Sequence, residues 1–434
     1  MVDKSYQNIF KLPELKKKLL ITLALLCVYR IGVAVPTPGI DGAALQSFFD
    51  GASGTLFSMF NMFSGGALER FSIFALGIMP YISASIIIEL MTVVVPYLEQ
   101  LSKEGEQGQK KKTQYTRYGT VFLSVIQGFA ISVGLEGMTA AAGAPVVLNP
   151  GWEFRFITII TLTAGTSFIM WLGEQITERG IGNGISLIIF AGIVARMPAA
   201  MANTAQLVTT GEMGIFSIII LSVLMVGVIA FIVYMEQAQR RIPVHYAKRV
   251  VGRKMYGGQS SHLPLKINTA GVIPPIFASS IIMFPTTLAQ FVDMPIMQDF
   301  SSLMSPGTIL YYTIYVGFVI FFCFFYTAIQ FKPDDVAENM KKNGGYIPGI
   351  RPGKRTSEYI DKVLSRITLG GAIYVSAVCV LPTILMTEFN IPFYFGGTAL
   401  LIVVGVSIDT VGQIESHLIT GNYDGFLGRS GKRK

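Results

Sequence analysis

The sequence predicts an all-α membrane protein with many spans, from its composition, its apolar runs and the placement of its charges. Of 434 residues, 51% are hydrophobic and only 14% are charged, whereas a soluble protein carries about 25% charged residues. The apolar residues gather into ten runs, and a helix needs roughly 17–25 such residues to cross a bilayer. These runs exclude the roughly three soluble domains that chain length alone would indicate.

Ten spans are therefore expected, with ends that the pattern sets only to within several residues. They occupy 19–38, 71–96, 119–135, 154–173, 183–198, 214–236, 268–290, 307–331, 367–387 and 394–415. Ahead of them, residues 1–18 place five lysines among apolar side chains, which is typical of a short helix lying on the membrane surface. The first run has no small-residue cleavage site, so no signal peptide is expected.

The basic residues indicate the orientation of these spans. With the N-terminus inside, the inside segments hold 30 of the 34 lysines and arginines, and only Arg30, Arg70, Arg155 and Arg196 fall elsewhere. The inside segments are 1–18, 97–118, 174–182, 237–267, 332–366 and 416–434. This asymmetry follows the positive-inside rule, so both termini are expected in the cytoplasm.

Ten spans divide into two sets of five, in residues 1–198 and 214–434, with an outside hinge loop at 199–213. An odd number of spans in each half gives the halves opposite orientations, which is the arrangement of inverted repeats that enclose a site. The halves share no clear sequence identity. A bundle of ten helices without internal symmetry therefore remains the alternative.

A short apolar piece at 56–63 precedes the second span, and it is too short to cross a bilayer. Gly65 and Gly66 join it to the apolar stretch 71–90, which carries Pro80 inside. Interrupted backbone at membrane depth is tolerated only where protein or water surrounds it. The sequence therefore predicts an element that lies in a cavity within the membrane.

The inside segment 332–366 is expected to be structured. Pro333 and Asp334 suit a helix start, and the pair at 344–345 suits its stop. Prolines and glycines at 348–353 then frame a tight turn around Arg351, which would hold one guanidinium on a rigid projection.

The inside segment 237–267 alternates in character at 242–246 and has a turn at 252–254, which predicts a basic hairpin. Basic projections fit RNA phosphates or an acidic protein surface. The alternative is that these charges only set topology, but a topogenic charge needs no rigid frame like that around Arg351.

The sequence has few candidate residues for catalysis or for metal or phosphate binding. The near-match to a phosphate loop at 349–356 has the wrong spacing and no preceding strand. The three histidines, at positions 245, 262 and 417, lack the spacing of metal ligands. The three cysteines, Cys27, Cys323 and Cys379, lie in apolar runs and are expected to be buried thiols. Acids fall near the inner ends of spans, where solvation or capping is usual, at Glu89, Glu174, Glu236 and Asp409. We therefore expect no enzyme, cofactor or metal.

Long and unusual strings stand along the whole chain. They include FNMFSGGAL at 60–68, FSIFALGIMPYISASII at 71–87, MWLGEQITERGIGNGIS at 170–186, QRRIPVHYAKR at 239–249, SSHLPLKINTAGVIP at 260–274, NGGYIPGIRPGKRT at 343–356 and PFYFGGTALLIVV at 392–404. On these strings the chain resembles the SecY family, the channel subunits of the bacterial secretory translocon. Glu89 departs from the neutral amide that is more usual in the family.

The resemblance implies two five-helix halves that close like a clamshell around an hourglass pore. A ring of aliphatic side chains would seal its waist, at Ile78, Ile82, Ile185, Ile189, Ile276 and Ile402. Spacings of four put the first two on one helix face and the next two on another. Such an apolar constriction gates by dewetting and makes no specific contact with a moving chain.

Three further sets follow from the resemblance. A plug helix and its tether, about 56–66, would include Phe57, Phe60, Met62, Phe63, Gly65 and Gly66. A lateral gate between spans two and three and spans seven and eight would include Ser83, Gln127 and Asn268. The motor SecA or a ribosome would dock on Arg240, Arg241, Arg253, Lys254 and Arg351.

The implied function is a passive channel for unfolded secretory proteins and nascent membrane proteins in the bacterial cytoplasmic membrane. Implied partners are SecE and SecG in a heterotrimer, the SecA ATPase, the ribosome and its RNA, signal sequences, nascent polypeptides, membrane lipids, SecDF and YidC. An ion-coupled secondary transporter of small solutes is the alternative, and it would need paired acids within the spans. A membrane scaffold without a pore would not need a glycine-tethered half-helix.

Overall fold

The computed structural model describes residues 13–42, 44–46, 61, 64–137, 145–210, 214–246, 249–251, 254–256, 260–291, 308–389 and 397–430. The chain forms two compact units. The larger unit contains Met1–Glu212, Ser280–Tyr311 and Ile402–Lys434, and the smaller unit contains Met213–Ser279 and Tyr312–Leu401.

Helices dominate both units. The larger unit contains α2 (Pro13–Val33), α5 (Met79–Val94), α6 (Pro96–Lys103), α7 (Glu106–Gly137), α8 (Trp152–Arg179), α9 (Gly184–Val194) and α10 (Met197–Thr209). The smaller unit contains α11 (Ile215–Gln237), α15 (Pro333–Lys342) and α16 (Lys354–Phe389). Three helices cross from one unit to the other: α12 (Ile273–Phe291), α14 (Ile309–Gln330) and α17 (Gly397–Ser430).

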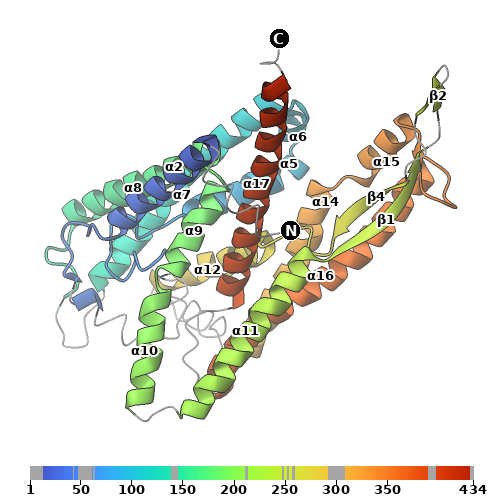
Figure 1. The fold of residues 1–434 in the computed structure, drawn as a ribbon. Helices are drawn as coiled ribbons and strands as arrows, with labels where there is room; N and C mark the ends of the chain where they lie inside the picture. The colour runs from blue at the N-terminus through green and yellow to red at the C-terminus, as the bar shows by residue number, and fades with distance from the viewer. Residues whose placement is uncertain are drawn as a thin grey trace. The chain divides into compact units, whose positions relative to one another are not determined.

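The predicted all-α membrane fold is confirmed. Among the described residues, six helices are long and apolar enough to cross a membrane, or seven if the bent pair α5 and α6 forms one span. Within the larger unit, α7 packs along α8 and against α5 (Figure 1). The count of ten spans stays a prediction.

The second span differs from its expected form. Residues 71–78 form turns instead of helix, and α5 begins at Met79 with Pro80 in its first turn. Proline suits that position because a first-turn N–H has no partner within the helix. At the other end the chain bends by 100° between α5 and α6, because Val95, which precedes Pro96, is extended rather than helical.

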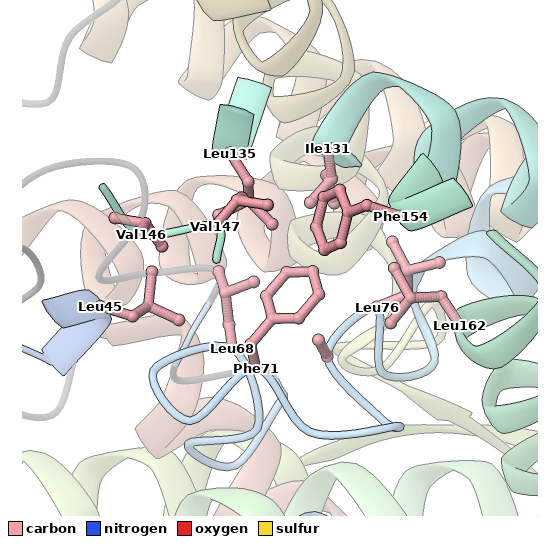
Figure 2. Close-up of a cluster of buried hydrophobic side chains, with 11 residues drawn as sticks. Leu45, Leu68, Phe71, Leu76, Ile131, Leu135, Val146, Val147, Phe154 and Leu162 are labelled. Atoms are coloured by element: carbon pink, nitrogen blue, oxygen red, sulfur yellow. The ribbon is translucent and has the colours of Figure 1, made fainter. Parts of the chain in front are cut away.

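The turns that precede α5 are buried in an apolar cluster at one end of α7 and α8. Figure 2 shows Phe71 at its centre, with Leu45, Val146, Val147 and side chains from α7 and α8 around it. The cluster contains Leu45, Leu68, Phe71, Ala75, Leu76, Ile131, Leu135, Val146, Val147, Phe154 and Leu162. Phe71 has a φ of +39°, a strained conformation for a residue other than glycine that persists only where its surroundings impose it.

Three smaller expectations need correction. The hinge loop expected at 199–213 is helical in α10 up to Thr209. Residues 13–18, expected in a surface helix, are continuous with the first span in α2, and residues 1–12 lie outside the described residues. Cys27 is exposed, whereas Cys323 and Cys379 are buried as expected.

The smaller unit carries a sheet with strand order β4-β1-β5. Strand β1 (Gln239–Tyr246) pairs antiparallel with β4 (Ser260–Lys266) and β5 (Gly345–Tyr346), and a second pair joins β2 (Arg249–Val251) to β3 (Lys254–Tyr256). The predicted hairpin is therefore present. The predicted helix at 333–343 is α15, with Pro333 in its first turn and Gly344 at φ +70° just past its end.

The sheet and the N-terminal end of α16 share one core. Ile242 and Val244 alternate with exposed residues along β1 and pack with Ile360 of α16, which is fully buried. The core also contains Leu265, Met340 and Ile347. Sheet, α15 and the start of α16 thus form one packed body.

We predict that Gly165→Ala destabilises the larger unit. A β-carbon at this position of α8 would lie 1.9 Å from the Ile73 carbonyl oxygen, so the turns before α5 would have to move. Overpacking of this kind costs about 1–3 kcal/mol, and the thermal unfolding midpoint in detergent should fall by several degrees. Gly137→Ala is the control, because a β-carbon there meets nothing within 4 Å. Equal midpoints for the two variants would contradict this packing.

Candidate functional site

The six isoleucines expected at the waist of a pore lie inside the structure. Ile78, Ile82 and Ile189 are 3–6% exposed, and Ile185 is partly buried. Ile402 on α17 is 1% exposed, and Ile276 on α12 is 9% exposed. Ile276 belongs to the smaller unit and the other five to the larger unit, so the closure of a ring stays a prediction.

The start of α5 places Ile78 and Ile82 one helical turn apart. The Ile82 N–H donates to the Ile78 carbonyl over 3.0 Å, so this first turn holds the backbones of both residues in register. Ile78 itself is the residue at the N-terminal boundary of α5 and not inside it. The helix begins later than expected, and the shared face of Ile78 and Ile82 toward a pore stays a prediction.

Helix α9 carries Ile185 and Ile189 and begins at a sharp turn after α8. The Asn183 side chain accepts hydrogen bonds from the N–H groups of Ile185 and Ser186, over 3.1 and 3.3 Å, and so caps the helix. A β-carbon at Gly184 would lie 1.9 Å from the Gly173 carbonyl oxygen. Only glycine allows this close approach of α9 to α8.

The two glycines of the tether have a defined backbone conformation. Gly65 and Gly66 have φ values of +68° and +86°, a left-handed conformation that glycine adopts at little cost. The Gly66 N–H donates to the Asn61 carbonyl over 2.9 Å. Of the expected plug, Phe57, Phe60, Met62 and Phe63 lie outside the described residues.

The tether is also bound to α2. The Tyr29 hydroxyl donates to the Ser64 carbonyl over 3.3 Å, and the Arg30 guanidinium donates to the Gly65 carbonyl over 2.8 Å. The sequence pattern placed Arg30 within the expected first span, 19–38, as one of four basic residues outside the inside segments. No local pattern marks it as a partner of a carbonyl that is 35 residues away.

The three residues expected at a lateral gate occupy two units. Ser83 on α5 and Gln127 on α7 are partly buried in the larger unit. The Gln127 Oε1 atom is buried and has no hydrogen-bond partner among the described residues. Asn268 precedes α12 in the smaller unit, where its amide donates to Glu236 over 2.7 Å and to the Gly271 carbonyl over 3.0 Å.

Two acids near the inner ends of spans are paired with basic side chains, where solvation or capping was expected. Glu89 on α5 lies 2.9 Å from the Lys112 ammonium on α7. Glu174 on α8 accepts two hydrogen bonds, each of 2.7 Å, from Arg117 on α7. These pairs tie three helices together, and they give Glu89, the departure from the family pattern, a partner within this chain.

Of the expected docking residues, Arg240, Arg241 and Arg351 lie on the body formed by the sheet, α15 and α16. Arg240 and Arg241 are exposed on β1, Lys254 belongs to β3, and Arg253 lies outside the described residues. Arg351 is exposed in a turn framed by glycines at φ +81° and +106°. Its carbonyl accepts from the Thr356 hydroxyl over 3.0 Å, so the projection is braced as expected.

Solved structures share this fold. "The structure of a protein conducting channel" matches with a TM-score of 0.63 at 18% identity, covering 92% of both chains. Canine Sec61 in a ribosome-channel complex from the endoplasmic reticulum matches with a TM-score of 0.61 at 17% identity, again covering 92% of both chains. The fold is therefore that of protein-conducting channels.

Sequence relatives narrow this class. A family model described as SecY matches residues 72–411. Protein translocase subunit SecY of Escherichia coli is 51% identical over 96% of this chain and 94% of its own length. The corresponding subunit of Aquifex aeolicus is 45% identical over 97% and 98%. The chain belongs to the SecY family.

Proposed function

We propose that this chain is the channel subunit through which unfolded secretory proteins cross the bacterial cytoplasmic membrane and nascent membrane proteins enter it. The observation that carries the proposal is the burial of all the expected waist isoleucines but one below 10% exposure, in a chain of the SecY family. Isoleucine offers no hydrogen bond or charge, so a waist made of it would be dry at rest and indifferent to the sequence that passes. The chain is a channel subunit and not an enzyme.

The partners follow from the same family membership. The curated relatives are translocase subunits, and one structural neighbour is bound to a ribosome. We propose SecE and SecG as companion subunits, and SecA or the ribosome as the source of energy. SecDF and YidC would act alongside them. Both termini would face the cytoplasm, because the inside segments hold 30 of 34 basic residues.

The two halves, 1–198 and 214–434, would open about the connection at 199–213. A signal sequence would leave into lipid between spans two and three on one side and seven and eight on the other. Ser83, Gln127 and Asn268 would form the polar seam of this gate. The buried Gln127 Oε1 supports that role, since an unpaired polar atom favours an arrangement that later supplies a partner.

The alternative, an ion-coupled transporter, needs acids free to bind ions within the spans. In the described residues, Glu89, Glu174 and Glu236 are engaged by Lys112, Arg117 and Asn268. Acids that hold helices together in this way do not favour a transport site.

The waist is tested by replacing Ile78, Ile82, Ile185 and Ile189 together with serine. The variant should raise the resting ion leak of reconstituted vesicles several-fold, because hydroxyl groups stabilise water in the constriction. Four exposed isoleucines, Ile157, Ile160, Ile219 and Ile220, replaced by serine in the same way, give the matched control. A leak no greater than that of the control would count against the waist.

The docking role is tested by Arg351→Glu. Reversing the charge on a braced projection should abolish SecA-driven translocation into vesicles while leaving the thermal midpoint within a degree or so, because the side chain is exposed. Lys341→Glu makes the same charge change at an exposed site on α15 and should retain most of the translocation. Unchanged transport in Arg351→Glu would refute the docking role.

The lateral gate is tested with one cysteine on α5, Ser83→Cys, and a second on α12. Bridging the two should stop signal-sequence insertion into lipid, and reduction should restore it. The readout is photocrosslinking of a stalled signal sequence to lipid. Insertion at the reduced-state rate through the bridged channel would dismiss the gate.

A further inference from the structure

Of the four arginines outside the inside segments, two converge on the glycine tether. Arg30 holds the Gly65 carbonyl over 2.8 Å. Arg196, two residues past the end of α9, lies 3.1 Å from the Glu69 carboxylate. Arginines retained against the positive-inside preference are thus placed on the segment that carries the expected plug.

Glu69 and Asn61 close the tether into a loop. The Asn61 amide donates to the Glu69 carboxylate over 2.9 Å, and the Glu69 N–H donates back to the Asn61 side-chain oxygen over 3.1 Å. Asn61 is only 4% exposed. The Arg196 side chain therefore binds the base of a closed loop and not a free chain end.

The backbone of the tether meets α9 at a second point. A β-carbon on Gly65 would lie 2.8 Å from the Gly192 Cα atom, and one on Gly192 would lie 3.2 Å from the Gly65 Cα atom. Position 65 therefore requires glycine for the two segments to approach so closely, and a β-carbon at position 192 would be tightly packed. Helix α9 also carries Ile185 and Ile189 of the proposed waist.

We infer that Glu69 and Arg196 are positioning residues that hold the glycine tether against the end of α9 and the residues that follow it. The contacts are hydrogen bonds, one ion pair and one close backbone approach, all of which separate without covalent change. The side chains of the ion pair are 25–35% exposed, which makes the pair weak enough to break as the channel opens. This inference rests on the proposed function for its meaning, but its test does not require translocation.

The test measures how often the tether opens at rest. The three natural cysteines are replaced by alanine, and Ser64→Cys, an isosteric change at a residue that is 1% exposed, supplies the probe. A membrane-impermeant maleimide is added to spheroplasts. Glu69→Lys and Arg196→Glu should each speed labelling about fivefold or more, as expected for the loss of a partly buried ion pair, and should raise resting ion leak in vesicles.

Two further variants distinguish loss of the Glu69–Arg196 ion pair from a general loss of structure. The reversed pair Glu69→Lys with Arg196→Glu should return labelling to within about twofold of the starting protein. Arg70→Gln, at the exposed neighbour of Glu69, should change neither readout. A structural defect alone would not be rescued by the reversed pair.

The inference is overturned if the single variants label at the starting rate, or if the reversed pair labels as fast as they do. Translocation of a secretory precursor is measured in parallel on the starting protein. If that protein fails to translocate, the proposed function is wrong whatever the labelling shows. If it translocates and the labelling rate is the same in the single variants, only the positioning role of Glu69 and Arg196 is wrong.

Discussion

An interrupted helix in an apolar environment must satisfy its own backbone, and the structure around Phe71 depends on that constraint. Unpaired backbone groups cost several kcal/mol each in lipid. Here the Thr37 N–H donates to the Phe71 carbonyl over 2.8 Å, and the Ile73 N–H donates to the Val35 carbonyl over 3.0 Å. The segment before α5 is therefore paired with the residues that follow α2, and this pairing sets where the tether and Ile78 lie.

Charged side chains and apolar side chains have different structural roles in this protein. Ion pairs hold the helices of the larger unit to one another: Glu89–Lys112 joins α5 to α7, and Glu174–Arg117 and Glu136–Arg155 join α7 to α8. The expected waist offers only aliphatic side chains. Helices that are held together by ion pairs of fixed geometry can position a constriction whose own side chains make no specific contacts.

Sequence patterns over a few residues predicted much of the fold. They did not predict contacts between residues that are far apart in the chain. Pro333 marked the start of α15, and the alternation at Ile242 and Val244 marked β1, because capping and burial act within a few residues. The ion pair of Glu174 could not be read from the sequence, since Arg117 is 57 residues away. Neither could the waist isoleucines be distinguished by pattern, because a buried and a lipid-facing isoleucine look alike within an apolar run. Pro80 was visible, yet its effect depended on whether it fell inside a helix or at its start.

The part of helix α16 from Lys354 to Pro382 is 29 residues long and apolar enough to cross a membrane, which is a length of about 44 Å at 1.5 Å per residue. Its first turns are embedded in the core of the β1–β4 sheet through Ile360, and the Ser357 hydroxyl is hydrogen-bonded to Asp334 of α15 over 2.5 Å. A load applied to the sheet therefore reaches the bilayer through a stiff rod with no slack joint between them. Whatever pushes on that sheet also tilts a span.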